Sequence, residues 1–221
     1  MADANLFGPW PRPDIRHLSG RYVQVARLDA AADIEDLYDV SHRTEEFRAL
    51  WRYLWNGPFE SKDAMYRWLA SVQDGADPIF YTVASTELGK NVGMFSLLNI
   101  VPEMGRAEFG HIWYSPLVQR TKVNTEVTFL FLRYMFDDLH YRRVEWKCDN
   151  LNEPSNRAAL RLGFKYEGLF RKHMVVKVKN RDTAWFAMLD EEWPSIKASF
   201  ETYLSNDGAS LTQLNQHGKK E

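Results

Sequence analysis

The most informative segment of the chain reads Asn152-Glu153-Pro154-Ser155-Asn156-Arg157-Ala158-Ala159-Leu160-Arg161-Leu162-Gly163-Phe164. It follows a β-rich run, Val144-Glu145-Trp146-Lys147-Cys148-Asp149, so the pattern predicts a strand that leads into a short helix ending at a glycine. Asn152 and Ser155 stand three residues apart at the helix start and therefore share one face. Ligands of α/β proteins often bind at such junctions. An ordinary helix cap explains the same two residues, and from spacing alone we favour the cap.

Bulk properties indicate a globular protein with a sizeable core. The chain has 221 residues, of which 45% are hydrophobic and 14% aromatic. Its net charge of -2 argues against general nucleic-acid binding, and it has no apolar run of about 18 residues that would span a membrane. The first residues lack the basic and apolar regions of a signal peptide. The single cysteine, Cys148, excludes an intramolecular disulfide and a cysteine-based zinc cluster. We therefore expect a cytoplasmic protein without a metal centre.

Periodicity predicts one domain between two irregular ends. The prolines and Gly20 make residues 1–20 an irregular arm, and the polar composition of residues 205–221 predicts a flexible tail. Residues 21–204 show no internal repeat and no dividing linker, so they are expected to form a single domain. Its first half is predicted to contain a strand at 21–28, helices at 30–40, 44–53 and 62–72, and strands at 79–85, 92–101 and 106–114.

The second half of the domain decides the fold class. A long, mostly buried helix with a polar stripe of Glu126, Arg133 and Asp137 should connect strand 106–114 to strand 143–148 by a parallel step. The rest of the sheet can be antiparallel. The pattern predicts an α/β (α+β) fold with a mixed, mostly antiparallel central sheet of about seven strands and helices on both faces. The expected elements are helix 124–138, strand 143–148, helix 153–162, strands 165–178 and 182–189, and helix 191–204.

The segment Ser115–Thr125 could bind an anion. It lies between a predicted strand and the start of the long helix, where free backbone N–H groups and the helix dipole attract phosphate. Arg120 and Lys122 add positive charge. An ordinary basic loop that caps a helix explains the same pattern equally well, so spacing alone leaves both interpretations open.

Glu108 is a second candidate. Regular alternation along its strand would place Glu108, Gly110, Ile112 and Tyr114 on one face, with His111 structural on the other. A carboxylate among apolar neighbours is costly to bury without a role or a partner. The alternative is a residue at the strand edge that pairs with Arg106 or a nearby lysine.

The aromatic residues near Gly57-Pro58 could line a pocket mouth. Trp51, Tyr53 and Trp55 stand there with Phe59 on a break between helices. Helix-packing aromatics are the somewhat better interpretation from the sequence alone. Cys148 stands alone in a strand and is expected to fill space rather than act as a nucleophile.

Together these features make the chain similar to the GNAT superfamily of N-acetyltransferases, and more narrowly to its ribosomal-protein N-terminal acetyltransferase (RimJ/RimL-like) branch. The resemblance covers about residues 20–204, and the strand order supports it. Its most specific parts are Asn152-x-x-Ser155, Gly163-Phe164 and Glu167-Gly168, with Asn180-Arg181-Asp182-Thr183 and Glu192-Trp193 near the C-terminus.

The resemblance implies acetyl-coenzyme A (acetyl-CoA) as cofactor. The family usually carries Gln/Arg-x-x-Gly-x-Gly/Ala in the loop that holds the pyrophosphate; Gln119 matches its first position, whereas Lys122 and Asn124 replace the glycines. Side-chain donors of Thr121 and Lys122 could compensate. By the same resemblance, backbone groups near Trp113 and Tyr114 and the side chain of Asn152 would bond the pantetheine arm. The implied cofactor-binding residues are Trp113, Tyr114, Gln119, Arg120, Thr121, Lys122, Val123, Asn124, Thr125, Asn152 and Ser155.

The resemblance also implies the catalytic roles. Many members carry a tyrosine acid seven residues after the asparagine, but Ala159 stands there, so the acid is expected to be Ser155, as in the related branch. Glu108 matches a strand acid that serves the incoming amine, and the aromatic residues Trp51, Tyr53 and Trp55 would help to bind it. A neutral amine would then attack the thioester directly in a ternary complex.

Two other functions remain open from the sequence. The missing glycines and Ala159 are compatible with a non-catalytic acyl-CoA sensor on the same fold, and the aromatic residues with an interaction module. As partners we expect an amine acceptor, at a protein N-terminus or on a small molecule. We expect no nucleic acid or membrane, and a homodimer is possible.

Overall fold

The computed structural model describes residues 8–205, 208 and 210–217. The chain divides into two compact units, each assembled from separated segments. Unit 2 comprises Ile15–Leu98 and Phe109–Val127. Unit 1 comprises Asn99–Glu108, the segment from Thr128 onward and the N-terminal segment that ends at Asp14. Because both units are discontinuous, no single linker separates them.

Unit 2 contains strands that pair antiparallel in the order in which they occur. Strand β1 pairs with β2, β2 with β3, and β3 with β4. The second part of β5 and the start of α4 also belong to this unit. The elements are β1 (His17–Ser19), β2 (Val23–Arg27), α1 (Ala30–His42), α2 (Glu45–Arg48), a 3-10 turn (Ala49–Tyr53), α3 (Lys62–Val72), β3 (Ile79–Ser85), β4 (Lys90–Val101), β5 (Arg106–Tyr114), a 3-10 turn (Pro116–Val118) and α4 (Val123–Arg133).

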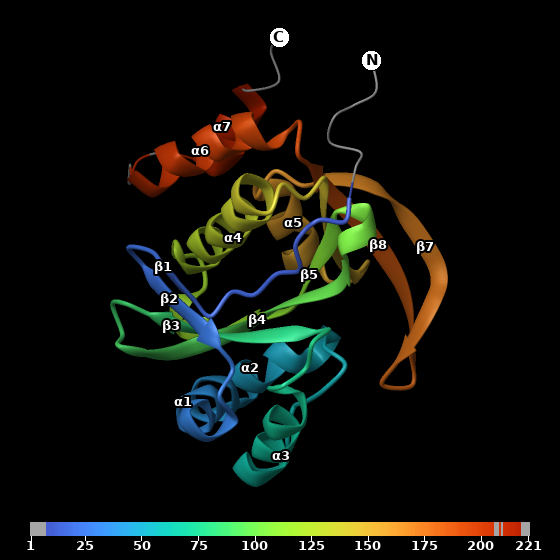
Figure 1. Cartoon of the computed structure of the whole chain (residues 1–221). Coiled ribbons are helices and arrows are strands. Elements are labelled where there is room, and N and C mark those ends of the chain that lie inside the picture. The colour runs from blue at the N-terminus through green and yellow to red at the C-terminus, as the bar shows by residue number, and fades with distance from the viewer. Residues whose placement is uncertain (1–7, 206–207, 209, 218–221) are drawn as a thin grey trace. The chain divides into compact units, whose positions relative to one another are not determined.

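The core of unit 2 forms where α1 and α3 meet the sheet. Helices α1, α2 and α3 lie together below strands β2–β4 in Figure 1. Leu37 of α1, Met65 and Leu69 of α3, and Phe80 of β3 are at most 2% exposed and belong to one apolar cluster. Burial of such side chains contributes about 1.5–3 kcal/mol each. Side-chain caps start both helices, Asp29 for α1 and Ser61 for α3, as expected from the sequence.

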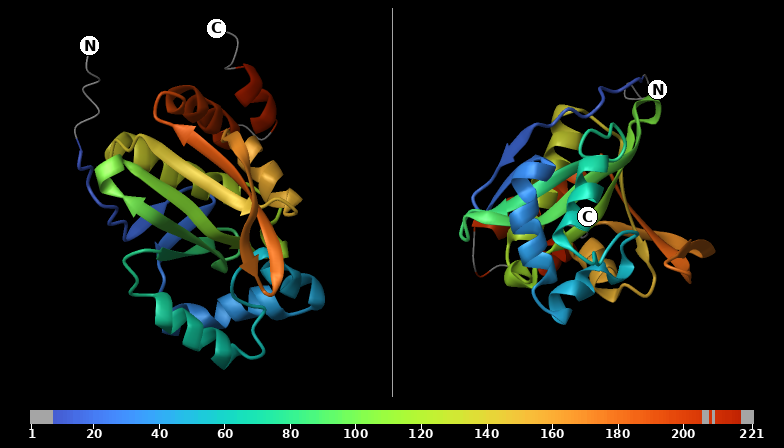
Figure 2. Two further views of the ribbon diagram at one scale, coloured as in Figure 1. Left: turned by 90° about the vertical axis from the view of Figure 1, so that its right-hand side faces the viewer. Right: turned by 90° about the horizontal axis from the view of Figure 1, so that it is seen from below.

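Unit 1 is built around a long hairpin. Strand β8 pairs antiparallel with both β6 and β7, and β7 and β8 extend as a twisted ribbon in Figures 1 and 2. Helix α7 packs beside α6 and α5. The elements are a π-helical turn (Tyr134–Asp138), β6 (Arg143–Asp149), α5 (Glu153–Arg161), β7 (Lys165–Val176), β8 (Lys179–Leu189), α6 (Trp193–Ser205) and α7 (Leu211–His217).

The predicted fold class is confirmed. The strands form one sheet in the order β1-β2-β3-β4-β5-β6-β8-β7. The sheet has eight strands rather than about seven because β1 pairs with β2 inside the segment expected to be irregular. Residues 1–7 of that arm lie outside the described part. Among the described residues, no helix has both the length and the apolar composition needed to cross a membrane.

Two expectations about helices were wrong. The predicted helix at 44–53 is a short α-helix followed by a 3-10 turn. Residues 211–217 of the predicted flexible tail are helical, with Leu211 2% exposed and Asn215 Nδ2 donating to Arg161 O at 2.9 Å. Residues 206, 207, 209 and 218–221 of that tail lie outside the described part. The amide bond to Arg161 O satisfies a carbonyl at the end of α5, which explains why a polar segment forms a helix there.

Strand β5 does not alternate regularly, because His111 adopts a left-handed backbone (φ 48°). Phe109 contacts Phe95 on one face of unit 2's sheet, whereas His111 contacts Phe80 and Ser96 on the opposite face. In a regular strand Phe109 and His111 would share a face. The expected common face of Glu108, Gly110, Ile112 and Tyr114 is therefore wrong.

Candidate active site

The junction between β6 and α5 places Asn152 and Ser155 as the sequence predicted. Asn152 is the N-cap of α5, and its Oδ1 accepts a hydrogen bond from Ser155 N at 3.3 Å. This cap uses only the oxygen of the amide; no described residue accepts from Nδ2. Both side chains are half-buried. Asn152 can therefore cap the helix and still offer a donor to a ligand.

The hydroxyl of Ser155 has a specific partner. Trp146 Nε1 lies 3.0 Å from Ser155 Oγ, and an indole N–H can only donate, so the serine oxygen accepts. The serine proton must then point elsewhere. Ala159, which occupies the position of the missing tyrosine, is fully buried. Ser155, which is half-buried, is therefore the candidate hydroxyl donor of this helix start.

Cys148 lies next to this serine and is a buried free thiol. Its Sγ donates to Asn156 Oδ1 at 3.4 Å. Burial raises the pKa of the Cys148 thiol, although a hydrogen bond with Ser155 opposes the shift. The neutral thiol is a weak nucleophile, in agreement with the expected space-filling role.

Glu108 is buried, 7% exposed, and held by two neighbours in unit 1. Lys147 Nζ lies 2.7 Å from Glu108 Oε2, and Asn99 Nδ2 donates to the same oxygen at 2.6 Å. No described residue donates to Oε1. The expected pairing with a nearby lysine is found, and it leaves one carboxylate oxygen for another group.

Lys147 joins Glu108 to a wider set of charges. Its ammonium group lies 2.8 Å from Glu145 Oε2 and 3.8 Å from the centre of the Trp185 ring. Burial opposes ionisation of Glu145, but hydrogen bonds from Lys147 and Arg143 outweigh it and hold the pKa of this carboxyl below its usual value. A buried lysine is thus compensated by two carboxylates and an aromatic face.

The loop between β5 and α4 is organised by its own side chains. Gln119 Nε2 donates to Tyr114 O at 3.4 Å, and Thr121 Oγ1 donates to Val118 O at 2.7 Å. Thr121 Oγ1 also accepts from Val123 N at 3.3 Å. The donor of Thr121 is therefore used inside the loop and cannot replace a glycine N–H, contrary to expectation. Thr125 is fully buried, so its side chain cannot reach a ligand.

Arg120 supplies a conformation that glycine would normally provide. Its φ is 64°, in the left-handed region that non-glycine residues seldom adopt. Gln119 before it is extended (φ −64°, ψ 143°), and Thr121 N donates to Val118 O at 3.4 Å, so residues 118–121 have the geometry of a type II turn, whose third position usually carries glycine. The loop thus forms a glycine-like turn without the two glycines at Lys122 and Asn124.

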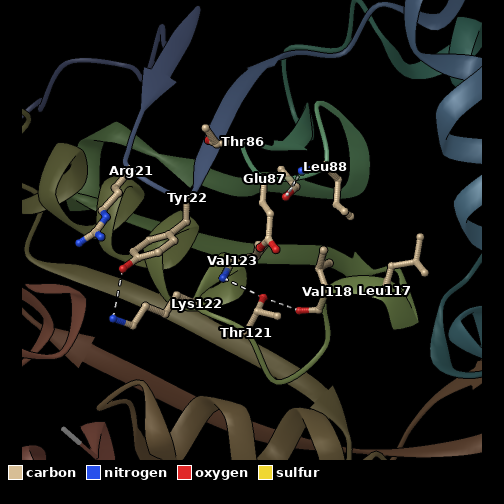
Figure 3. Close-up of a pocket in the computed structure, with 11 residues that line it drawn as sticks. Arg21, Tyr22, Thr86, Glu87, Leu88, Leu117, Val118, Thr121, Lys122 and Val123 are labelled. Carbon is tan, nitrogen blue, oxygen red and sulfur yellow. Dashed lines mark hydrogen bonds between the residues drawn. The ribbon is translucent and has the colours of Figure 1, made fainter. Parts of the chain in front are cut away.

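A pocket of about 420 Å³ opens beside this loop (Figure 3). Lys122 and Tyr22 point toward one another there, with Lys122 Nζ donating to the tyrosine oxygen at 3.2 Å. Arg21 adds a second cation and Glu87 a carboxylate. The pocket is lined by Arg21, Tyr22, Ser85, Thr86, Glu87, Leu88, Leu117, Val118, Thr121, Lys122 and Val123.

Glu126 anchors the first turn of α4. It was expected on a polar stripe, but it is 5% exposed and accepts three backbone hydrogen bonds. Its Oε1 accepts from Arg21 N at 2.9 Å, and its Oε2 accepts from Tyr22 N at 2.6 Å and Val23 N at 2.9 Å. A Cβ on Gly20 would collide with this carboxylate, which explains the glycine. Glu126 thereby fixes α4 and the pocket wall to the start of β2.

The aromatic candidates separate into core and surface. Trp51 is 1% exposed and packs on Trp113 at 5.1 Å between ring centres, so the expectation that it binds substrate is corrected to a core role. A cavity of only about 10 Å³ remains beside these rings. Tyr53 is half-buried, and Trp55 is 47% exposed and available at the surface. Trp113 and Tyr114 are buried side chains, so a ligand could reach only their backbone. Burial also raises the pKa of Tyr114, so its phenol stays protonated near neutral pH.

Sequence reasoning missed Trp146, Lys147 and Glu126. All three act through contacts with residues distant in sequence, and none stands in a motif. A signal was present for Lys147, since it alternates with Glu145 on a predicted strand and a buried lysine needs a carboxylate partner. The described part of the chain contains no group of three His, Cys, Asp or Glu side chains that could hold a metal ion.

Comparison with known proteins identifies the family. Residues 26–165 match the family described as Acetyltransferase (GNAT) domain. A GCN5-related N-acetyltransferase from Brucella melitensis shares 38% identity and a TM-score of 0.92, over 95% of this chain and 98% of that one. A probable acetyltransferase (GNAT family) from Chromobacterium violaceum shares 36% identity and a TM-score of 0.78, over 85% and 93% of the two chains.

A more distant relative carries a more specific name. YdaF of Bacillus subtilis (strain 168), provisionally named a ribosomal N-acetyltransferase, is 28% identical over 109 residues, which is 49% of this chain and 59% of YdaF. The matched stretch thus spans little more than half of that relative. The chain belongs to the GNAT family of N-acetyltransferases, whose members transfer acetyl groups and generally take them from acetyl-CoA.

Proposed function

We propose that this protein transfers the acetyl group of acetyl-CoA to a primary amine, on a protein N-terminus or a small molecule, by direct attack in a ternary complex. The observation that carries the proposal is the half-buried Ser155 at the start of α5, whose oxygen accepts from Trp146 so that its proton points away from the indole. The name of YdaF supports a protein N-terminus as one acceptor to be tested.

The residues of the β5–α4 loop fit the diphosphate of the cofactor. Helix α4 begins there with its positive dipole end, Arg120 turns the backbone as glycine would, and Lys122 contributes a cation at the pocket. Arg120, Lys122 and the backbone of Val123 and Asn124 would hold that end. Asn152 Nδ2 would bond an amide oxygen of the pantetheine arm.

Acetyl-CoA, when bound, supplies an activated acetyl thioester. Ser155 would supply its hydroxyl proton to the leaving sulfur and would recover one from solvent afterwards. Glu108 Oε1 would accept the proton that the attacking amine loses. Because Lys147 and Asn99 both bond to Oε2, the Glu108 carboxylate is fixed, and no described residue donates to its Oε1.

Two measurements test the proposal. Calorimetry with acetyl-CoA should show binding, and thiol release in the presence of a panel of small primary amines and N-terminal peptides should show turnover. Ser155→Ala should lower kcat about 100- to 10,000-fold, the range of a lost general acid, with cofactor affinity retained. Glu108→Gln should lower kcat/KM for the amine. Tight binding with no turnover of any acceptor would support an acyl-CoA sensor instead, and absence of binding would contradict both functions.

A further inference from the structure

Trp146 lies in the interior of unit 1, and its indole N–H donates to Ser155 Oγ at 3.0 Å. It is 4% exposed in the middle of β6, opposite Phe186 of β8, and its ring packs on Phe164 at 5.7 Å between ring centres. Phe164 is itself 2% exposed. The indole therefore cannot turn without disturbing a packed core, and its N–H stays aimed at Ser155 Oγ.

The serine is held at a second point. Its backbone N–H donates to Asn152 Oδ1, which fixes the first turn of α5, while the indole fixes the side chain. A free serine hydroxyl rotates among three staggered positions. Here the oxygen already accepts from Trp146, so the position that turns the O–H bond toward the indole is excluded.

The neighbouring thiol does not compete strongly for the serine proton. The Cys148 Sγ–H donates to Asn156 Oδ1, and burial raises the pKa of this thiol, so its sulfur stays neutral. A neutral sulfur is a weak acceptor, whereas a departing thiolate is a strong, charged one. The proton of Ser155 is thus available for transfer when negative charge develops nearby.

We propose that Trp146 is the positioning residue that orients the hydroxyl of Ser155 for donation to the leaving sulfur. The inference rests on the proposed role of Ser155 and adds to it the residue that makes the role possible. The alternative is that the contact merely satisfies a buried indole N–H. A structural role of that kind would change stability but would not act through Ser155.

A double-mutant cycle separates the two roles. Trp146→Phe removes the N–H and keeps a ring of similar shape. In the wild-type background it should lower kcat roughly 10-fold or more, because misplacing a reacting group by about 1 Å can cost 100-fold, with little change in KM. In the Ser155→Ala background it should have no further effect. An unchanged kcat in Trp146→Phe, or an equal loss in both backgrounds, would overturn the inference.

Controls keep the result interpretable. Trp193→Phe removes another buried indole N–H of unit 1, which donates to Asp137 Oδ1 at 2.7 Å and not to Ser155, so it should lower stability while kcat stays within a few-fold of wild type. If Ser155→Ala alone leaves kcat unchanged, the proposed role of Ser155 fails, which is a different outcome from failure of the inference. If Trp146→Phe does not fold, the indole N–H resonance of Trp146 should still shift in Ser155→Ala; no shift would overturn the contact.

Discussion

Removal of the Glu126 carboxylate tests whether this side chain anchors the first turn of α4, and with it the β5–α4 loop, to the start of β2. In Glu126→Ala, three backbone N–H groups at the start of β2 lose their acceptor at once. Glu126→Gln is milder, because an amide oxygen can replace Oε2 and keep the bonds from Tyr22 and Val23. Its NH₂ group then faces the N–H of Arg21.

The magnitude follows from the three contacts. Hydrogen bonds to a charged group contribute about 1.5–3 kcal/mol each, so three bonds at the lower end give about 4.5 kcal/mol. Arg21 is exposed and water can replace part of its bond, which lowers the expectation to about 4 kcal/mol for the alanine variant. For a chain of this size that corresponds to a fall of roughly 8–16 °C in Tm. The glutamine variant should lose about half as much.

Thermal unfolding followed by circular dichroism measures the effect, and Glu153→Ala is the matched control. Glu153 also lies in the first turn of its helix, near the positive end of the helix dipole, but its side chain is 75% exposed and forms an ion pair with Arg157. The control should change stability by less than about 0.5 kcal/mol. If Glu126→Ala were as mild as Glu153→Ala, the three hydrogen bonds would not anchor the helix.

The remaining predictions concern Gly20, His111 and helix α7. Gly20→Ala should destabilise the protein by about 1–3 kcal/mol, because the added methyl group collides with the Glu126 carboxylate. This loss should largely disappear in the Glu126→Ala background. Urea unfolding of the wild type, the two single variants and the double variant measures both effects. Burial lowers the pKa of His111 to about 4. In the unfolded chain the pKa of His111 is near 6.5, so between about pH 4 and pH 6.5 the unfolded chain binds a proton that the folded protein does not bind. Stability from this group is therefore present above pH 6.5 and lost as pH falls toward 4, with a slope of at most about 1.4 kcal/mol per pH unit. His111→Asn, which tolerates the left-handed backbone, should flatten the slope of unfolding free energy against pH; an unchanged slope would assign it to other groups. Leu211→Ala should destabilise the protein by about 2–4 kcal/mol, and faster hydrogen exchange in α5 and α7 than in α1 would locate the effect.

Elements with clear boundaries could be predicted to the residue. Strands Ile79–Ser85 and Arg106–Tyr114 and helix Lys62–Val72 have the predicted limits, because a proline, a glycine or a serine cap stands beside each. Strand β1 has three residues and helix α7 seven, too few for a periodic pattern, and both depend on partners elsewhere in the chain. Contacts with distant parts of the chain, and not local propensity, therefore determine that β1 and α7 form.

The candidate site shows the same division. Asn152 and Ser155 could be located from the sequence because helix N-termini show local preferences for capping residues. The bulge at His111 could not be predicted from the sequence, because the left-handed histidine contacts Ser96 and Phe80, which belong to other strands. The hydrogen bond from Trp146 to Ser155 could not be predicted either, because the two residues meet only when β6 and α5 have both folded.

The turn at Arg120 has a consequence for how such proteins are found. Patterns written in amino-acid letters look for glycine in a phosphate loop, and this chain offers none between Ser115 and Thr125. The backbone nevertheless passes through a left-handed residue there. A search defined by dihedral angles would retrieve this loop, and others like it, where a search for glycine would discard them.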